Sequence, residues 1–348
     1  MKMKIGNIEI GESNKVFIIA ELSANHNQQF EIAVESLKAI KNCGADAVKL
    51  QTYTPDTLTI DSDKDYFKIQ QGTIWDGTTL YQLYQKAYTP WEWQPKLKSI
   101  AEELGLICFS SPFDKSAVDF LEKMNVPAYK IASFEIVDIP LIEYVASKGK
   151  PVIISTGIAT EEEIKEAIDA CNRMGNNQIA LLKCTSEYPA KIEDANLNAI
   201  PYLEKKFNTP VGLSDHTLGI TVPIAAVALG ARIIEKHFIL DKKIGGPDAA
   251  FSLEPDQFKK MVDEIRAVEL ALGENKFVHT EKVKKSRTFA RSIFVVEDVK
   301  TGDLFTEKNV RSIRPSNGLP PKFYKDILGK KAKVDIEKGT PLSWDLIG

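Results

Sequence analysis

Two histidines and two lysines at the ends of short apolar runs have the side chains for ionic chemistry. His216 follows VGLSD, and His237 lies near the end of ARIIEKHF. Two imidazoles with carboxylates nearby and no thiolate suit a labile divalent ion such as Mn²⁺, with Mg²⁺ or Co²⁺ as alternatives. Lys49 and Lys130 bring two positive charges, which suit a phosphate, a carboxylate or a ligand that carries both. These residues predict metal-assisted chemistry on an anionic substrate.

Polar side chains also occur at the ends of the other apolar runs. A single one has an ordinary structural explanation, since a serine before a helix is usually an N-cap. Their recurrence at the same end of every run indicates one shared site. Together with the lysines and histidines, the set includes Glu21, Gln51, Ser111, Ser133, Ser155, Ser186 and Tyr188.

Eight apolar runs are available to position these residues. They are continuous rather than alternating, as is typical of parallel strands buried on both faces. The runs are 16–21, 45–51, 106–111, 127–133, 151–157, 178–184, 210–215 and 231–238. Helical patterns lie between them, at 30–44, 115–124, 139–149, 160–175, 196–207, 221–230 and 255–273. In one of these patterns Thr160 and Glu163 have the spacing of a capping box.

This alternation of strands and helices predicts an α/β fold, a (β/α)₈ TIM barrel over residues 1–273. In such barrels the active site lies at the C-terminal ends of the strands, where the polar residues gather. A doubly wound sheet is the alternative, but no G-x-G-x-x-G follows a strand, which weakens its dinucleotide-binding form. An aromatic-rich insertion over 52–90 is expected to be a lid or an interface. Residues 274–290 are interpreted as a linker, and 291–348 as a small module of short strands.

Composition excludes several classes of function. The net charge is −3 with no basic block, so neither nucleic acid nor an anionic membrane is expected as a partner. No apolar run approaches the roughly 18 residues of a membrane-spanning helix, and the N-terminal stretch is too polar for a secretory signal. Four scattered cysteines without C-x-x-C spacing are expected to be buried free thiols. We therefore expect a cytoplasmic protein.

Several motifs together resemble the sialic acid synthase family. They are FIIAELSANHN, GADAVKLQTY, CFSSPFD, AYKIASFE, GLSDHTLG, ALGARIIEKHF and GGPDAAFSLEP. The family condenses phosphoenolpyruvate with an amino-sugar aldehyde to make nine-carbon keto acids. The segment IRPSNGLPPKFYKDILGK resembles the antifreeze-like (SAF, β-clip type) domain that such enzymes carry. Within the family, ELSANH, LQTYTPDTLT, YTPWEW and IASFE resemble the pseudaminic acid synthases, whose sugar is 2,4-diacetamido-2,4,6-trideoxy-L-altrose.

The resemblance also implies roles for individual residues. His216 and His237 match metal ligands, and Glu21 matches an acidic group near the reacting carbons. Gln51 and Asp248 match positions around the sugar. Arg314 matches an arginine that a partner subunit inserts into the site, which implies a domain-swapped homodimer. Residues that match the phosphoenolpyruvate site are Lys49, Ser111, Lys130, Ser133, Ser155, Ser186 and Tyr188.

Alternatives to this reading differ in substrate or in class. Phe134 and Ser186 depart from the N-acetylneuraminate synthases, which typically have Gly and Asn there, and these departures argue against N-acetylneuraminate as the product but not against the chemistry. An N-acetylneuraminate or legionaminate synthase is the alternative with the same chemistry. A metal-dependent hydrolase on the same barrel would usually need more histidines than the four present. A non-enzymatic carbohydrate- or ice-binding protein would not explain the charged strand ends. Release of phosphate from phosphoenolpyruvate would distinguish these classes.

Overall fold

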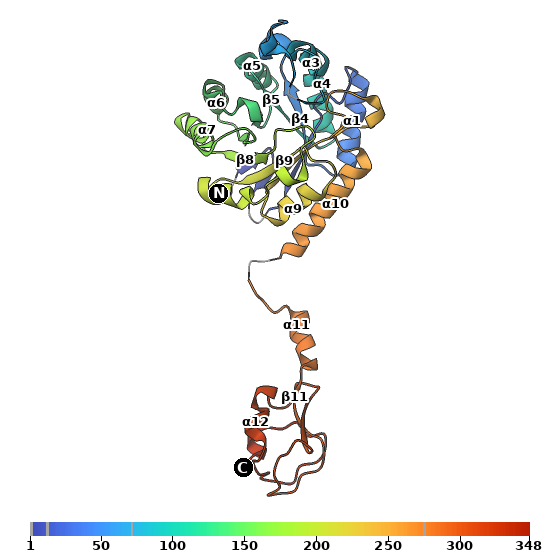
Figure 1. Cartoon of the computed structure of the whole chain (residues 1–348), viewed down its shortest axis with the longest axis vertical. Coiled ribbons are helices and arrows are strands. Elements are labelled where there is room, and N and C mark those ends of the chain that lie inside the picture. Colours follow the sequence, from blue (N-terminus) through green and yellow to red (C-terminus); the bar gives the residue numbers. More distant parts are fainter. Residues whose placement is uncertain (1–2, 12–13, 71, 274–275) are drawn as a thin grey trace. The chain divides into compact units, whose positions relative to one another are not determined.

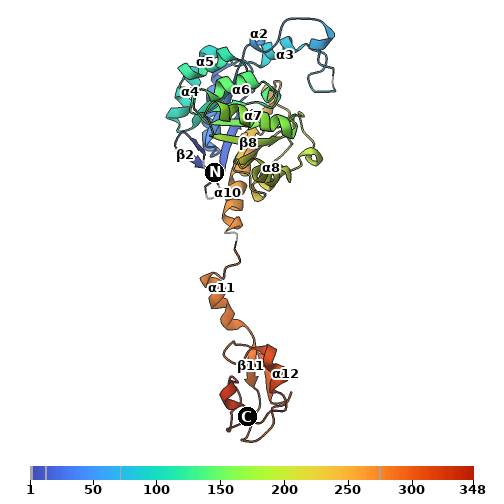
Figure 2. The same ribbon diagram turned by 90° about the vertical axis from the view of Figure 1, so that its left-hand side faces the viewer.

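The computed structural model describes residues 3–11, 14–70, 72–273 and 276–348. The chain divides into two compact units, Met1–Gly273 and Glu274–Gly348. Figures 1 and 2 show both units in two orientations.

The first unit is a closed barrel of eight parallel strands in the order β10-β3-β4-β5-β6-β7-β8-β9. This confirms the predicted TIM barrel, and each strand falls within or next to one of the apolar runs. Nearly every strand residue is buried, which explains why the runs are continuous. The strands are β3 (Phe17–Glu21), β4 (Ala47–Thr52), β5 (Ile107–Pro112), β6 (Tyr129–Ile131), β7 (Val152–Ser155), β8 (Ile179–Cys184), β9 (Val211–Asp215) and β10 (Ile233–His237).

Helices surround the barrel (Figure 1). Thr160 caps α7 as the sequence predicts, because its side chain accepts from the Glu163 N–H and Glu163 accepts from the Thr160 N–H. Helix α4 was not located by the sequence pattern. The surrounding helices are α1 (Phe30–Asn42), α4 (Gln94–Glu103), α5 (Lys115–Lys123), α6 (Ile139–Ala146), α7 (Glu161–Arg173), α8 (Ala199–Phe207), α9 (Thr221–Ala228) and α10 (Pro255–Leu272). Among the described residues, no helix is both long and apolar enough to cross a membrane.

A short antiparallel hairpin, β1 (Met3–Ile5) and β2 (Ile8–Ile10), precedes the barrel and was not predicted. Its turn contains Gly6, with φ +57°, where a side chain would meet Ile107 at the start of β5. The hairpin therefore lies at the N-terminal end of the strands. That end is opposite to the one where the polar residues gather.

The insertion after β4 folds into short helices, α2 (Pro55–Leu58) and α3 (Leu80–Ala87). Each begins with a threonine cap, Thr54 for α2 and Thr79 for α3. In Figure 2 these helices lie at the end of the barrel away from β2. The insertion thus belongs to the C-terminal end of the strands. Its residue 71 lies outside the described residues.

The second unit has its own apolar core under two antiparallel strands, β11 (Ser292–Val295) and β12 (Val310–Ile313). The predicted strand in AKVDIEKGTPL forms only isolated bridges, such as Val299 with Ile336. The core comprises Ile293, Val295, Val299, Phe305, Val310, Ile327, Ala332, Ile336, Leu342 and Ile347. Helix α12 (Tyr324–Ile327) contributes to it, and α11 (Glu281–Ser286) lies in the predicted linker, whose residues 274–275 are outside the described part.

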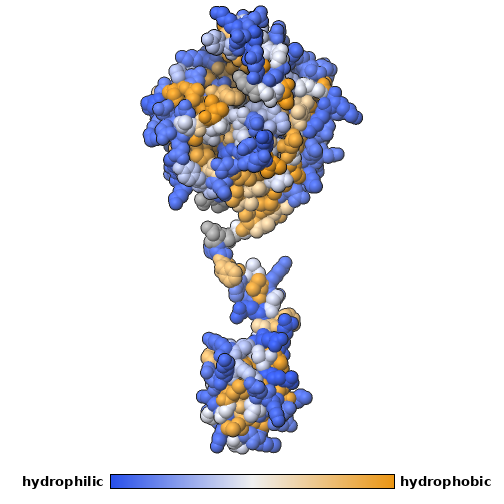
Figure 3. All heavy atoms as spheres, viewed as in Figure 1, coloured by the Kyte–Doolittle hydropathy of each residue, from blue (hydrophilic) through white to orange (hydrophobic). Residues whose placement is uncertain are grey.

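Short 3₁₀ helices complete the two units. They are η1 (Asp65–Phe67), η2 (Trp91–Trp93), η3 (Ser133–Glu135), η4 (Ile192–Asp194), η5 (Lys242–Ile244), η6 (Arg287–Phe289), η7 (Pro321–Phe323) and η8 (Trp344–Leu346). Hydrophilic residues form most of the outer edge of the barrel unit in Figure 3, and hydrophobic residues are seen mainly inside that edge. The four cysteines are buried and free, as expected.

Candidate active site

The parallel register brings the ends of neighbouring strands together. His237 on β10 stands opposite Glu21 on β3, and Glu21 stands opposite Lys49 on β4. Gln51, two residues beyond Lys49, stands opposite Ser111 on β5. Because side chains alternate along a strand, Lys49 and Gln51 share one face. Residues far apart in the sequence thus converge on one end of the barrel.

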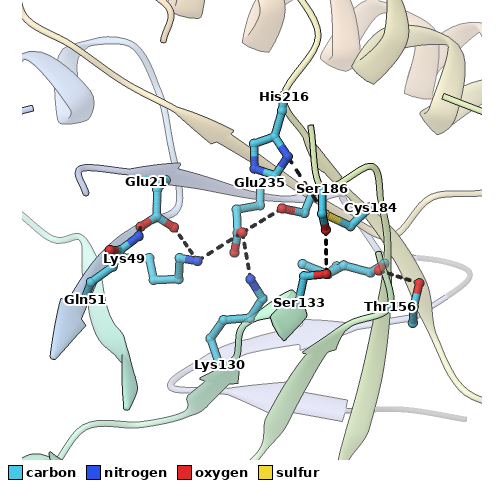
Figure 4. A network of polar contacts seen from close by, with 12 residues as sticks. Glu21, Lys49, Gln51, Lys130, Ser133, Thr156, Cys184, Ser186, His216 and Glu235 are labelled. Carbon is cyan, nitrogen blue, oxygen red and sulfur yellow. Dashed lines mark hydrogen bonds and ion pairs between the residues drawn. The ribbon is translucent and has the colours of Figure 1, made fainter. Parts of the chain in front are cut away.

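A buried glutamate joins the two lysines. Glu235 Oε1 lies 3.0 Å from Lys49 Nζ and 2.9 Å from Lys130 Nζ. The Ser214 hydroxyl donates to the same oxygen at 2.9 Å, whereas Glu235 Oε2 is buried without a hydrogen-bond partner. Figure 4 shows Glu235 between the two lysines. One carboxylate oxygen therefore accepts three donors, and the other is left for a group from solution.

Charge interactions set the ionisation of this cluster. Burial raises the pKa of Glu235, but Lys130 and Lys49 outweigh it and hold that pKa well below its ordinary range. Burial lowers the pKa of Lys49 to about 7, against the opposing effect of Glu235. Lys49 also pairs with Glu21, whose Oε1 accepts from Gln51 Nε2 at 3.1 Å. An added negative charge would therefore favour the protonated form of Lys49.

Serine hydroxyls gather at the ends of β5 to β8. Ser133 Oγ and Ser186 Oγ lie 2.6 Å apart. Gly157 allows both hydroxyls to approach the backbone closely, because a Cβ there would clash with Ser186 Oγ and, at 2.6 Å, with Ser133 Oγ. Ser111 Oγ and Ser155 Oγ are buried without hydrogen-bond partners. Buried hydroxyls usually have partners, so these atoms indicate a place for a polar ligand.

The two histidines form a pair with free ring nitrogens. Their ring centroids lie 5.3 Å apart, and His216 Nδ1 is 2.9 Å from the Thr185 carbonyl, which leaves its Nε2 free. His237 Nδ1 is buried without a hydrogen-bond partner. Burial lowers the pKa of His237 well below its ordinary value, so its imidazole is neutral near pH 7. Burial also lowers the pKa of His216, but Cys184 and the Thr185 carbonyl outweigh it and raise that pKa overall.

These histidines fit a weakly held divalent ion. Neutral imidazole is a common ligand of such ions, and an orphaned buried nitrogen is a position that a metal would satisfy. No cluster of three or more His, Cys, Asp and Glu suited to a metal occurs in the described part of the chain. The chain would therefore supply two ligands, and oxygens from water and substrate would complete the coordination.

Asp248 and Tyr188 lie beside the histidines. Asp248 Oδ2 is 3.8 Å from His237 Nδ1 and accepts from the Ser23 hydroxyl. The Tyr188 ring centroid is 4.4 Å from that of His216. The structure therefore brings the candidate residues of the barrel into one region. Glu21 on β3 lies between Lys49 on β4 and His237 on β10 in the strand register.

Arg314 belongs to the second unit. It directly follows β12 and its side chain is exposed. An exposed guanidinium on a small module is available for an oxygen-rich ligand.

The candidate set drawn from the sequence omitted Glu235, which lies on β10. Its spacing from His237 could have identified it as a site residue, because side chains two positions apart on a strand point to the same face. Lys236 between them faces the other way and forms a buried pair with Asp215 at 2.5 Å. His26, in the turn after β3, pairs with Thr89 and is fully buried. Strand alternation thus places Glu235 and His237 in the site and Lys236 outside it.

This chain is similar to known proteins over nearly its whole length. The chain is 53% identical over 340 residues, 98% of each chain, to a pseudaminic acid synthase of Campylobacter jejuni subsp. jejuni serotype O:2. It is 54% identical over 329 residues to a pseudaminic acid synthase of Helicobacter pylori, covering 94% of this chain and 96% of that one. A solved N-acetylneuraminic acid synthetase from Leptospira borgpetersenii, in complex with citrate, superimposes with a TM-score of 0.75 at 32% identity, covering 82% and 95% of the two chains.

Family-level matches cover both units. Residues 290–348 match the SAF domain, so the second unit is the predicted antifreeze-like domain. Residues 36–277 match the NeuB family, which spans most of the barrel. The chain therefore belongs to the NeuB family, with a SAF domain at its C-terminal end.

Proposed function

We propose that this protein is a pseudaminic acid synthase. It condenses phosphoenolpyruvate with 2,4-diacetamido-2,4,6-trideoxy-L-altrose and water to give pseudaminic acid and phosphate. The observation that carries the proposal is the buried pair Lys49 and Lys130 around Glu235, in the same site as the histidine pair, in which His237 Nδ1 is buried without a hydrogen-bond partner. Identities of 53% and 54% to pseudaminic acid synthases, against 32% to the N-acetylneuraminic acid synthetase, support the choice of sugar.

Phosphoenolpyruvate fits the polar half of the site. Its phosphate and carboxylate together carry about −2.5 to −3 charges near neutral pH, since a phosphate monoester carries about −1.5 to −2. Lys49 and Lys130 offset part of this charge, and hydroxyls of Ser111, Ser133 and Ser155 donate to the ligand oxygens. Ser186 and Tyr188 line the same ligand from the segment after β8. The hydroxyls without partners are the ones that such a ligand would satisfy.

The two substrates meet between the lysines and the histidines. Carbon three of phosphoenolpyruvate attacks the aldehyde carbon of the open-chain sugar, which leaves a cationic centre at carbon two. Gln51 and Asp248 hold the sugar, and binding both reactants in line accounts for a large share of the rate. His216 and His237 would hold a divalent ion, most simply Mn²⁺, which when bound supplies Lewis-acid polarisation of the aldehyde oxygen.

Water then completes the reaction. It adds at carbon two, and the resulting tetrahedral centre expels phosphate by cleavage of the C–O bond. Glu21 takes the proton from that water, a role supported by its contacts with Lys49 and Gln51 at the C-terminal end of the strands. Lys49 and Lys130 stabilise the charge on the departing phosphate.

Arg314 is proposed to act on a second copy of the chain. In a domain-swapped homodimer, the antifreeze-like domain of one subunit caps the barrel of the other. The guanidinium then donates several hydrogen bonds to the sugar in fixed geometry. The proposed reaction needs no nucleic acid and no membrane, and we place it in the cytoplasm.

The substrate proposal is tested with a panel of amino-sugar aldehydes and phosphoenolpyruvate, by measuring phosphate release and keto acid formation. We expect the diacetamido trideoxy sugar to exceed N-acetylmannosamine by about 10–200-fold in kcat/KM, because a methyl-sized change in a pocket has this effect. Faster turnover of N-acetylmannosamine or of the legionaminate precursor would contradict the choice of sugar. An absence of phosphate release with every sugar would favour a binding protein.

Replacing either histidine tests the metal ligands. We expect His216→Ala and His237→Ala to lose activity and Mn²⁺ binding while the far-UV circular dichroism stays unchanged, because both lie at a site rather than in the apolar core. His26→Ala is the matched control, since His26 is buried but lies outside the site and bonds to Thr89. It should lower stability and leave Mn²⁺ affinity unchanged. Wild-type Mn²⁺ affinity in either ligand variant would refute the assignment.

Mixing two inactive variants tests whether Arg314 acts in trans. Lys49→Ala and Arg314→Ala each remove one part of the site, and after subunit exchange a mixed dimer has one site with both residues intact. Activity should return to about a quarter of wild type, because half of the dimers are mixed and half of their sites are complete. If exchange is demonstrated and activity does not recover, Arg314 acts within its own chain or has no role.

A further inference from the structure

Trp75 lies at the outer end of a row of aromatic rings that begins at the histidine pair. The Tyr188 centroid is 4.4 Å from that of His216, and the Trp75 centroid is 5.4 Å from that of Tyr188. Phe251 packs behind them, 5.3 Å from Tyr188 and 4.9 Å from His237 between centroids. The insertion after β4 therefore contributes a side chain to the wall of the site.

Trp75 is also fixed by a hydrogen bond across the barrel mouth. Its indole Nε1 donates to the Pro247 carbonyl at 3.0 Å. Pro247 immediately precedes Asp248, whose carboxylate lies 3.8 Å from His237 Nδ1. This bond joins residues 172 positions apart in the sequence. Trp75 is thus tied to the same loop that places Asp248 beside the histidines.

The turn that carries Trp75 is stabilised locally. The Asp76 carboxylate accepts from the backbone N–H of Gly72 at 2.9 Å and of Thr73 at 2.8 Å. Gly77, with φ +89°, donates its N–H to the Ile69 carbonyl at 3.2 Å. The turn therefore presents the indole in a defined position, half-buried and with one surface facing outward.

The direction in which the sugar extends follows from the site. Its aldehyde end meets the histidine pair, and the inner end of the barrel is filled by the cluster of Lys49, Lys130 and Glu235. The far end of the sugar is therefore directed toward the mouth of the barrel, where Trp75 lies next to Tyr188.

The chemistry of the indole restricts what it can accept. Trp has a single donor, which Pro247 already occupies, so the remaining surface offers only apolar contact. A hydroxyl pressed against this surface would lose water without gaining a partner, whereas a methyl group gains from leaving water. A sugar with an apolar far end is favoured at this position.

We propose that Trp75 is a specificity-determining residue, whose indole contacts the C6 methyl and the adjacent acetamido methyl of the sugar. This inference rests on the proposed function and names the part of the substrate that the insertion recognises. Phe134, in η3 after β6, is another aromatic side chain at the C-terminal end of the strands, but it is 56% exposed. No ring contact of Phe134 occurs within the described residues, so it serves as the matched control.

The test compares Trp75→Ala, Trp75→Phe and Phe134→Ala in the full-length protein with saturating phosphoenolpyruvate. In Trp75→Ala we expect kcat/KM for the diacetamido trideoxy sugar to fall about tenfold or more, mainly through KM. The value for N-acetylmannosamine should change little, so the ratio between the sugars falls. KM for phosphoenolpyruvate should stay within about twofold, Trp75→Phe should restore most of the ratio, and Phe134→Ala should leave it unchanged.

Two results would overturn the role of Trp75. One is an unchanged ratio between the sugars in Trp75→Ala, and the other is a parallel rise in KM for both substrates, which would indicate a general loosening of the site. Calorimetric titration of the diacetamido sugar provides a measurement that does not depend on turnover, and Trp75→Ala must weaken that binding. If wild-type protein binds this sugar but does not release phosphate with it, the proposed function fails while the role of Trp75 stands.

Discussion

A single carboxylate oxygen, Glu235 Oε1, holds the two lysines that the site depends on. Two ammonium groups without water would be very costly to bury, and the effective penalty is several kcal/mol for each ion. Glu235 and Glu21 reduce this cost because they give Lys49 and Lys130 partners at hydrogen-bond distance. The cluster depends on the closed barrel, because its residues come from four different strands, β3, β4, β6 and β10, whose ends meet only when the barrel closes.

The same arrangement prepares the site for a multiply charged substrate. The two lysines and two glutamates carry no net charge when all are ionised, which limits the cost of burying them, but burial still lowers the pKa of Lys49 to about 7 while no ligand is bound. A phosphate and a carboxylate that enter would share the ammonium groups with Glu235 and would interact strongly in the low dielectric of the buried site. The unpartnered hydroxyls of Ser111 and Ser155 can donate to the oxygens of such a ligand, whereas Glu235 Oε2 can only accept, as from a water molecule.

The sequence predicted the barrel well, because its strands are continuous apolar runs and its helices have clear apolar faces. It also predicted which strand ends carry polar residues, since register in a parallel barrel brings those ends together. It did not predict that Glu235 accepts three donors, which depends on side-chain geometry. It likewise missed the contact of Trp75 with Pro247, because a non-periodic loop meets a residue 172 positions away. In the second unit, isolated bridges replaced a predicted strand, since short segments pack there by tertiary contact.

Proton uptake on binding phosphoenolpyruvate tests most directly whether this charge cluster is the substrate site. The pKa of Lys49 is lowered to about 7 in the free protein, so at pH 8 this lysine is largely neutral, and a bound trianion should raise its pKa and draw in close to one proton. Calorimetric titrations without sugar, in buffers of different ionisation enthalpy, measure this number. We predict uptake at pH 8, little uptake at pH 6, and none at either pH in Lys49→Arg, which stays charged. Binding at pH 8 without proton uptake in the wild-type protein would contradict the account.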